Sequence, residues 1–221
     1  MRIRRKKNLD KRLAGLTDYI IPVDDTVKDA RLVNENKDYI DLNNAFGKER
    51  PLCIEIGCGK GGFITELAAH NPDKIYIAVE MMDNIVMMAA ENAKSKRLFN
   101  VKFLNTGAQY LPRYFKESSA ETIFLNFSPP YPQKSYECRR LTNDNFINVY
   151  NHLLASGGSI EQKTDDKDFF EYSVKKLSAA GFKVFDVTDD IAFEERNVQT
   201  EYEKKFLKNG LKIYKLIAIK P

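Results

Sequence analysis

A glycine-rich stretch between an apolar run and an amphipathic segment constrains the fold of this chain more than any other feature. Leu52–Ile56 is a short, mostly apolar run of the kind that forms a buried parallel strand. Gly57, Gly59 and Gly61 follow at alternate positions, and with Gly62 the stretch also contains the spacing G-x-G-x-x-G. A strand that turns sharply into a helix needs residues without a Cβ, so that the backbone can bend and a ligand can approach it. The stretch therefore predicts a site for a nucleoside-containing cofactor, with a plain tight turn as the alternative.

Two acidic residues favour the cofactor site over the plain turn. Glu80 ends the next apolar run, 75–80, where a carboxylate can accept hydrogen bonds from both hydroxyls of a ribose. Glu55 lies inside the first apolar run, and a carboxylate in such a place is costly unless a partner compensates its charge. A cationic cofactor would be such a partner.

Apolar runs and amphipathic segments alternate after Pro51, which predicts an α/β fold with a doubly wound, mostly parallel sheet. We expect strands over 52–56, 75–80, 101–105, 122–127, 159–163, 182–186 and 211–219. We expect helices over 61–70, from a cap at Asp83 to about Arg97, over 111–115, after a cap at Thr142, over 167–179 and over 201–208. Residues 1–50 are expected to form a basic arm and an irregular lead-in, and residues 51–221 a single domain.

The positive charge of the chain is concentrated at its start. Residues 1–12 contain seven basic residues and one acidic residue, and the remaining 28 basic and 30 acidic residues give the rest a net charge of −2. A dense basic arm on a nearly neutral body is suited to holding the phosphates of a nucleic acid. A solvated, frayed terminus is the alternative.

Composition excludes several other classes of protein. No apolar run approaches the length of a membrane span, and the charged start is unlike a signal peptide, so we expect a cytoplasmic protein. The three cysteines, Cys53, Cys58 and Cys138, lack the spacing of metal ligands, and with only two histidines no metal site is expected. The choice between monomer and homodimer is left open.

The end of the fourth expected strand carries the second informative motif, Asn126-Phe-Ser-Pro-Pro-Tyr131. Two consecutive prolines cannot join a sheet ladder, so the strand must end there in a rigid, extended loop. Ligands of open α/β sheets bind at this carboxyl edge.

These motifs resemble those of known methyltransferases. Glu55-x-Gly57-x-Gly59 resembles the first motif of class I S-adenosylmethionine-dependent enzymes, which have a Rossmann-like fold. Ser128-Pro-Pro-Tyr131 alone resembles the catalytic motif of DNA methyltransferases that act on exocyclic amino groups. The wider run from Asn126 to Thr142, with Arg139-Arg140-Leu-Thr142 at its end, resembles bacterial tRNA (guanine-N7)-methyltransferases instead. Three further segments resemble the same family, namely 1–7, Gly158–Asp165 and Thr200–Glu203.

The tRNA-methyltransferase resemblance implies methyl transfer from S-adenosylmethionine to guanine N7 in the variable loop of tRNA, and an antiparallel closing strand. The residues that it implies for the cofactor are Glu55, Gly57, Gly59, Glu80, Gly107, Ala108, Asn126 and Pro129. Those that it implies for the tRNA are Gln133, Lys134, Arg139, Arg140, Asp165, Thr200, Glu201, Tyr202 and Glu203, with Asp165 as the candidate catalytic residue.

The chain departs from the family pattern at several positions. Pro129 stands in place of the usual loop aspartate, Tyr131 in place of a tryptophan, Gln133 in place of a lysine and Gly107 in place of an aspartate. Two alternatives therefore stay open. One is a DNA amino-methyltransferase, although the chain offers no residues for a target-recognition domain, and the other is a tRNA-binding protein without catalysis. For Asp165 a helix N-cap, and for Thr200 and Glu203 a capping box, are the structural alternatives.

Overall fold

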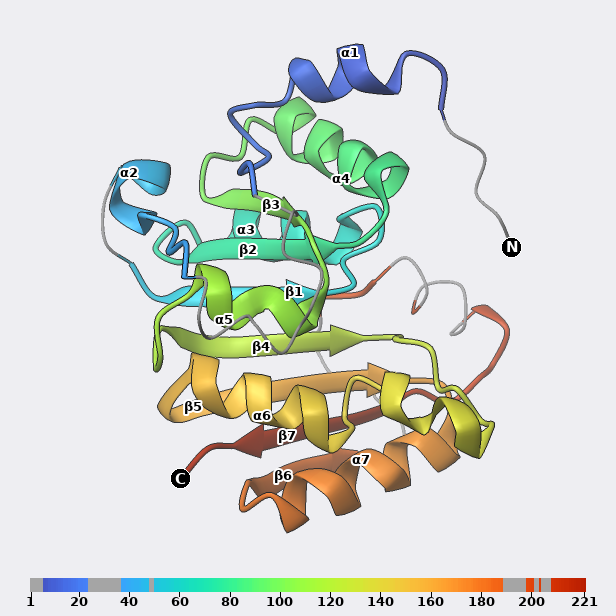
Figure 1. Ribbon diagram of the computed structural model, residues 1–221. Helices are drawn as coiled ribbons and strands as arrows, with labels where there is room; N and C mark the ends of the chain where they lie inside the picture. The colour runs from blue at the N-terminus through green and yellow to red at the C-terminus, as the bar shows by residue number, and fades with distance from the viewer. Residues whose placement is uncertain (1–5, 24–36, 48–49, 189–197, 201–202, 204–207) are drawn as a thin grey trace.

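The computed structural model describes residues 6–23, 37–47, 50–188, 198–200, 203 and 208–221. Seven strands form one sheet in the order β3-β2-β1-β4-β5-β7-β6 (Figure 1). The strands are β1 (Leu52–Ile56), β2 (Ile75–Glu80), β3 (Val101–Asn105), β4 (Ala120–Asn126), β5 (Leu154–Thr164), β6 (Lys183–Thr188) and β7 (Tyr214–Ile219).

The first five strands pair in parallel, and β7 runs antiparallel to both β5 and β6. In Figure 1 the arrowheads of β4 and β5 accordingly point to one side and that of β7 to the other. The expected doubly wound, mostly parallel sheet with an antiparallel closing strand is confirmed. The carboxyl ends of the parallel strands meet at one edge, which is where such sheets bind ligands.

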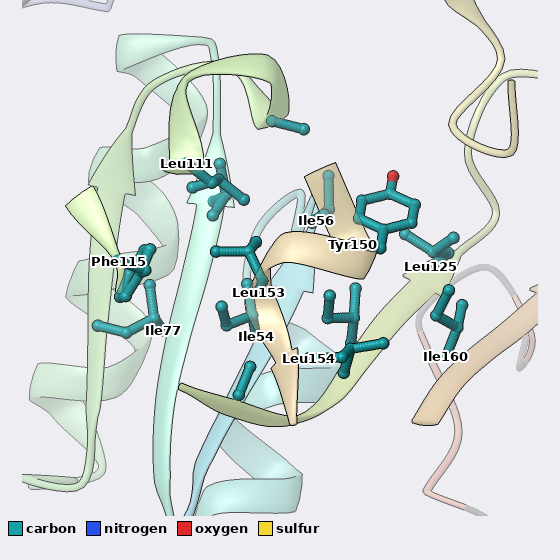
Figure 2. Packing of buried hydrophobic residues seen from close by; sticks show 14 of the residues in the cluster. Ile54, Ile56, Ile77, Leu111, Phe115, Leu125, Tyr150, Leu153, Leu154 and Ile160 are labelled. Carbon is teal, nitrogen blue, oxygen red and sulfur yellow. The ribbon is translucent and has the colours of Figure 1, made fainter. Parts of the chain in front are cut away.

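Apolar side chains alternate between the two faces of the sheet and build a core on each. The helical elements after the lead-in are α3 (Gly62–His70), α4 (Asp83–Ser95), η2 (Ala108–Tyr110), α5 (Leu111–Tyr114), η3 (Lys134–Arg139), α6 (Asp144–Leu153) and α7 (Lys167–Ala179). One face is covered by α5, α6 and α7, and the other by α3 and α4. Figure 2 shows the first of these cores, where Leu111, Tyr150 and Leu153 pack on strand residues such as Ile54 and Ile77.

The lead-in is more regular than its sequence suggests. It contains α1 (Leu9–Ala14) and α2 (Leu42–Phe46), which the prediction of an irregular segment missed. Leu9, Leu16 and Tyr19 are buried in the core beneath α4, and the Arg12 Nε donates to Glu91 Oε1 of α4 over 2.7 Å. Short helices held by tertiary packing carry little periodic signal, which explains why the pattern did not reveal them.

Several predicted boundaries were wrong by a few residues, and two caps were misplaced. Asp83 is the first residue of α4 rather than its cap, and its Oδ1 accepts a hydrogen bond from Asn105 Nδ2 over 2.6 Å. Asn143, not Thr142, caps α6, while Thr142 is fully buried and hydrogen bonds with Ser173. β5 begins at Leu154, directly after α6, and so earlier than the predicted 159. The Gly157-Gly158 pair lies where the register of β5 with β4 shifts.

Candidate functional site

The glycine turn after β1 leaves open space beside its backbone. Gly57, Gly59 and Gly61 all have positive φ angles, of 77°, 55° and 74°, which residues with a Cβ rarely adopt. A Cβ on Gly61 would lie 3.0 Å from that of Ala89, so this glycine lets α3 begin close against α4. A Cβ on Gly57 or Gly59 would meet nothing within 4 Å. A ligand can therefore approach the backbone at these two positions.

Glu55 is a buried carboxyl group with an open acceptor. It is 2% exposed, and its Oε1 accepts a hydrogen bond from Asn126 Nδ2 over 3.0 Å. Its Oε2 has no hydrogen-bond partner among the described residues. Burial raises the pKa of Glu55 to about 7, while the bond from Asn126 and the charge of Lys163 oppose this rise. A cationic group placed at Oε2 would satisfy the free acceptor and favour the ionised form.

Glu80, at the tip of β2, is oriented by two backbone donors. Its Oε2 accepts from Gly59 N over 3.3 Å and its Oε1 from Met82 N over 3.1 Å. These bonds hold the carboxylate beside the glycine turn. Gly107 and Ala108 lie at the end of the neighbouring β3, where Ala108 begins η2 and is buried. The structure thus brings the expected cofactor residues of β1, β2 and β3 to one edge of the sheet.

The proline-rich loop after β4 has an unusual backbone. Phe127 and Tyr131 have positive φ angles of 49° and 42°, and such strain in residues with side chains concentrates at functional sites. Ser128 is buried, and its Oγ has no partner among the described residues, whereas Pro129 is exposed. Arg140 stabilises the loop, because its guanidinium donates to the carbonyl of Pro130 over 2.9 Å and that of Tyr131 over 3.1 Å.

The two arginines of this loop have different surroundings. Arg140, besides its two carbonyl contacts, lies over the ring of Tyr172 at 4.4 Å, so its side chain is largely engaged within the protein. Arg139 is exposed and stacks over Tyr136 at 4.6 Å. Gln133 and Lys134 are also exposed. The face of η3 is therefore a polar, positively charged surface next to the carboxyl edge.

Asp165 follows β5 at the same edge and is exposed. Its neighbour Asp166 is the N-cap of α7, since the Asp166 Oδ1 accepts from Phe169 N over 2.7 Å. Asp165 makes no hydrogen bond or ion pair within the part of the chain that the structure describes. The capping alternative for Asp165 is thereby excluded.

Thr200 and Glu203 form the capping box that their spacing allows. The Thr200 Oγ1 accepts from Glu203 N over 2.9 Å, and Glu203 Oε2 accepts from Thr200 N over 3.3 Å. Both residues are buried, Glu203 completely, so their side chains have a structural role in this state. Glu201 and Tyr202, and Arg2, Arg4 and Arg5 of the arm, lie outside the described residues.

Lys163 is a residue near the site that the sequence prediction missed. Its ammonium is buried, 3.1 Å from Glu203 Oε2 and 3.1 Å from the carbonyl oxygen of Val198. It also lines a cavity of about 240 Å³ that extends along the α3 side of the sheet past Phe63 and Asn126. The only sequence signal for this role was a lysine in a strand directly before Thr164-Asp165. Its partner Glu203 is 40 residues away in sequence, so the pair could not be predicted.

Comparison with known proteins identifies the family of this chain. A family model described as a putative methyltransferase matches residues 49–216. A tRNA (guanine-N(7)-)-methyltransferase of Geobacillus kaustophilus (strain HTA426) is 39% identical over all of this chain and 98% of its own length. One of Streptococcus pyogenes serotype M18 is 35% identical over 99% of each chain. The chain belongs to the tRNA (guanine-N(7)-)-methyltransferase family. The suspected family is thereby confirmed.

Solved structures support the fold assignment of this family member. The 16S rRNA methyltransferase KamB superposes with a TM-score of 0.64 at 14% identity, covering 84% of this chain and 96% of its own. An antibiotic-related methyltransferase gives 0.62 at 20% identity, with 83% and 96% covered. The fold is that of class I methyltransferases, as expected. No helix in the described part of the chain is long and apolar enough to cross a membrane. Within that same part, no cluster of His, Cys, Asp and Glu side chains is arranged to hold a metal ion.

Proposed function

We propose that this protein transfers a methyl group from S-adenosylmethionine to N7 of a guanine in the variable loop of tRNA. Family membership along the whole chain supports the reaction. The observation that carries the proposal is the pairing of two features at one sheet edge. The buried Glu55 with its open Oε2 lies beside the glycine turn, and the exposed Asp165 lies at the end of β5.

The residues of the first three strands fit the cofactor. Glu55 Oε2 can accept a hydrogen bond from its amino group, and Glu80 can accept from the ribose hydroxyls. The free space beside Gly57 and Gly59 admits its methionine portion. Gly107 and Ala108 border the adenine, and Asn126 and Pro129 close the side nearest the loop. When bound, S-adenosylmethionine supplies an electrophilic methyl group on a sulfonium.

Methylation of guanine N7 does not require the protein to remove a proton. The lone pair of N7 is available in the major groove and carries no proton, so attack on the methyl group needs no general base. Pro129 in place of the family aspartate is therefore compatible with catalysis. What remains for the protein is to align N7 with the methyl group and to stabilise the purine as it becomes cationic.

Asp165 is the carboxylate suited to that second task. It is exposed and makes no internal hydrogen bond among the described residues, so it can face the purine ring. Gln133, Lys134 and Arg139 contact the tRNA from the surface of η3, and Arg140 keeps the loop in shape for them. We assign the segment of Thr200, Glu201, Tyr202 and Glu203 to guanine binding. Thr200 and Glu203 support it through their capping box, and Glu201 and Tyr202 supply the contacts.

Residues 1–50 serve tRNA binding through their basic arm, and residues 51–221 hold cofactor and guanine. We place the protein in the cytoplasm because tRNA is modified there.

The test is nucleoside analysis after the full-length protein has been incubated with unmodified tRNA and methyl-labelled S-adenosylmethionine. We expect label in 7-methylguanosine and in no other nucleoside. Label in an amino-methylated base of DNA would favour the alternative that Ser128-Pro-Pro-Tyr131 raises, and binding of tRNA without label would overturn the proposed reaction.

A further inference from the structure

Lys163 joins segments that are far apart in sequence at the edge where the site lies. Its side-chain ammonium donates to the Val198 carbonyl and to Glu203 Oε2, both over 3.1 Å. The same ammonium lies 5.5 Å from the ring centre of Phe63, the second residue of α3. Its backbone carbonyl accepts from Phe127 N over 2.8 Å, at the start of the proline-rich loop. Asp165 follows two residues later.

The ion pair between Lys163 and Glu203 carries a large desolvation cost, because both charged groups are buried. The side chains of Lys163 and Glu203 are 7% and 0% exposed, so both charges have lost most of their water. Burial lowers the pKa of Lys163, and the charge of Glu203 opposes this effect. Buried ion pairs contribute little net stability compared with apolar side chains of similar size. Stability alone is therefore a poor reason for a lysine at this position.

The position that Lys163 imposes on its partners explains the buried lysine better than stability does. Glu203 is already held by the capping box with Thr200, so the capped turn would form without Lys163. What Lys163 adds is a fixed distance between that turn, the Val198 backbone and the end of β5. An error of about 1 Å in such an alignment can slow a reaction by about two orders of magnitude.

We infer that Lys163 is a positioning residue, whose ammonium holds Val198 and the Thr200–Glu203 capping box against the carboxyl end of β5 beside Asp165. This inference rests on the proposed function, because the group to be aligned is the guanine of tRNA. Lys163 acts through the segment and touches neither guanine nor methyl group.

The test uses variants that separate position from stability. Lys163→Met removes the ammonium and leaves the Glu203 charge buried without its ion-pair partner, so we expect it to unfold more easily. Lys163→Met with Glu203→Gln also removes the carboxylate charge, while glutamine still forms a capping box. We expect this double variant to regain most of the lost thermal stability. Lys74→Met is the matched control, since Lys74 pairs with Glu121 3.0 Å away in a partly exposed ion pair at the opposite edge of the sheet.

Two measurements decide the outcome. In the double variant we expect amide hydrogen exchange of Val198, Thr200 and Glu203 to be faster than in the wild type. We also expect kcat on tRNA to be lower by about ten- to a hundredfold while the Kd for S-adenosylmethionine stays the same. The Lys74→Met control should show neither change.

Recovery of kcat together with stability in the double variant, or unchanged exchange in the segment, would make the pair merely structural and would overturn the inference. Failure of the proposed function has a different signature, namely a wild-type protein that forms no 7-methylguanosine. The exchange measurement needs no activity and tests the anchoring in either case.

Discussion

Glu55 shows how burial prepares a single residue for a charged ligand. Burial raises the pKa of Glu55 from an ordinary 4.5 to about 7, so between these values the folded protein holds a proton that the unfolded chain has released. The stabilising contribution of this proton is complete below pH 4.5 and is lost as pH rises through 7. A cationic ligand at Oε2 favours the ionised form and must expel the proton.

The first prediction follows from this linkage. Near pH 6, binding of S-adenosylmethionine should release close to one proton from Glu55, and affinity should rise with pH by up to about tenfold per unit until pH 7. Calorimetry in buffers of different ionisation enthalpy measures the released proton. Glu55→Gln keeps the bond to Asn126 but cannot titrate, so its binding should release no proton. Equal proton release in both proteins would contradict the assignment of Glu55.

The second prediction concerns Glu80. Glu80→Ala should weaken S-adenosylmethionine binding by about 1.5–3 kcal/mol, because it removes a charged acceptor. Calorimetry measures the change, and thermal unfolding checks that loss of the bonds from Gly59 N and Met82 N has not disrupted the turn. Unchanged affinity would rule out Glu80 as the ribose acceptor. Tight binding of a nicotinamide dinucleotide would return the glycine turn to the dinucleotide-binding class.

At the scale of elements, the regular parts of the sheet could be predicted from sequence and the tertiary contacts could not. β1, β2 and β3 have the predicted bounds, since each is a short, mostly apolar run bounded by turn residues. The N-cap of α7 is Asp166 and not Asp165, and the sequence pattern could not decide between these two adjacent aspartates. The Lys163–Glu203 ion pair joins residues that are 40 apart in sequence, so no local pattern predicts it. The sequence likewise contains no sign that Arg140 binds the carbonyls of its own loop rather than phosphates.

The third prediction concerns the basic arm as an element. Replacing Arg2, Arg4, Arg5, Lys6 and Lys7 by glutamine should weaken tRNA binding and flatten the dependence of log K on log salt. Substitution is preferable to deletion, because the backbone N–H of Lys6 donates to Asn84 Oδ1 over 2.8 Å and should keep doing so. The affinity for S-adenosylmethionine serves as the control and should not change. An undiminished salt slope would show that the arm is only a frayed terminus.

At the scale of the whole molecule, the question is whether an enzyme of this family can work with Pro129 in its loop. The loop keeps its strained backbone at Phe127 and Tyr131 and is held by Arg140, so its shape does not depend on an aspartate at position 129. Asp165 is exposed at the carboxyl end of β5, and we propose it as the carboxylate that stabilises the purine during methyl transfer.

The fourth prediction therefore compares these two positions. Asp165→Asn keeps the shape of the side chain but removes its charge, so kcat should fall by about 10²-fold, with a much smaller change in the Kd for tRNA. Pro129→Asp should change kcat only modestly, because N7 attack needs no base. Single-turnover methylation and filter binding of tRNA measure the two quantities separately. A wild-type protein that forms no 7-methylguanosine, combined with activity in Pro129→Asp, would make this chain a tRNA-binding relative that has lost catalysis. Equal losses of kcat and tRNA affinity in Asp165→Asn would instead assign Asp165 to binding.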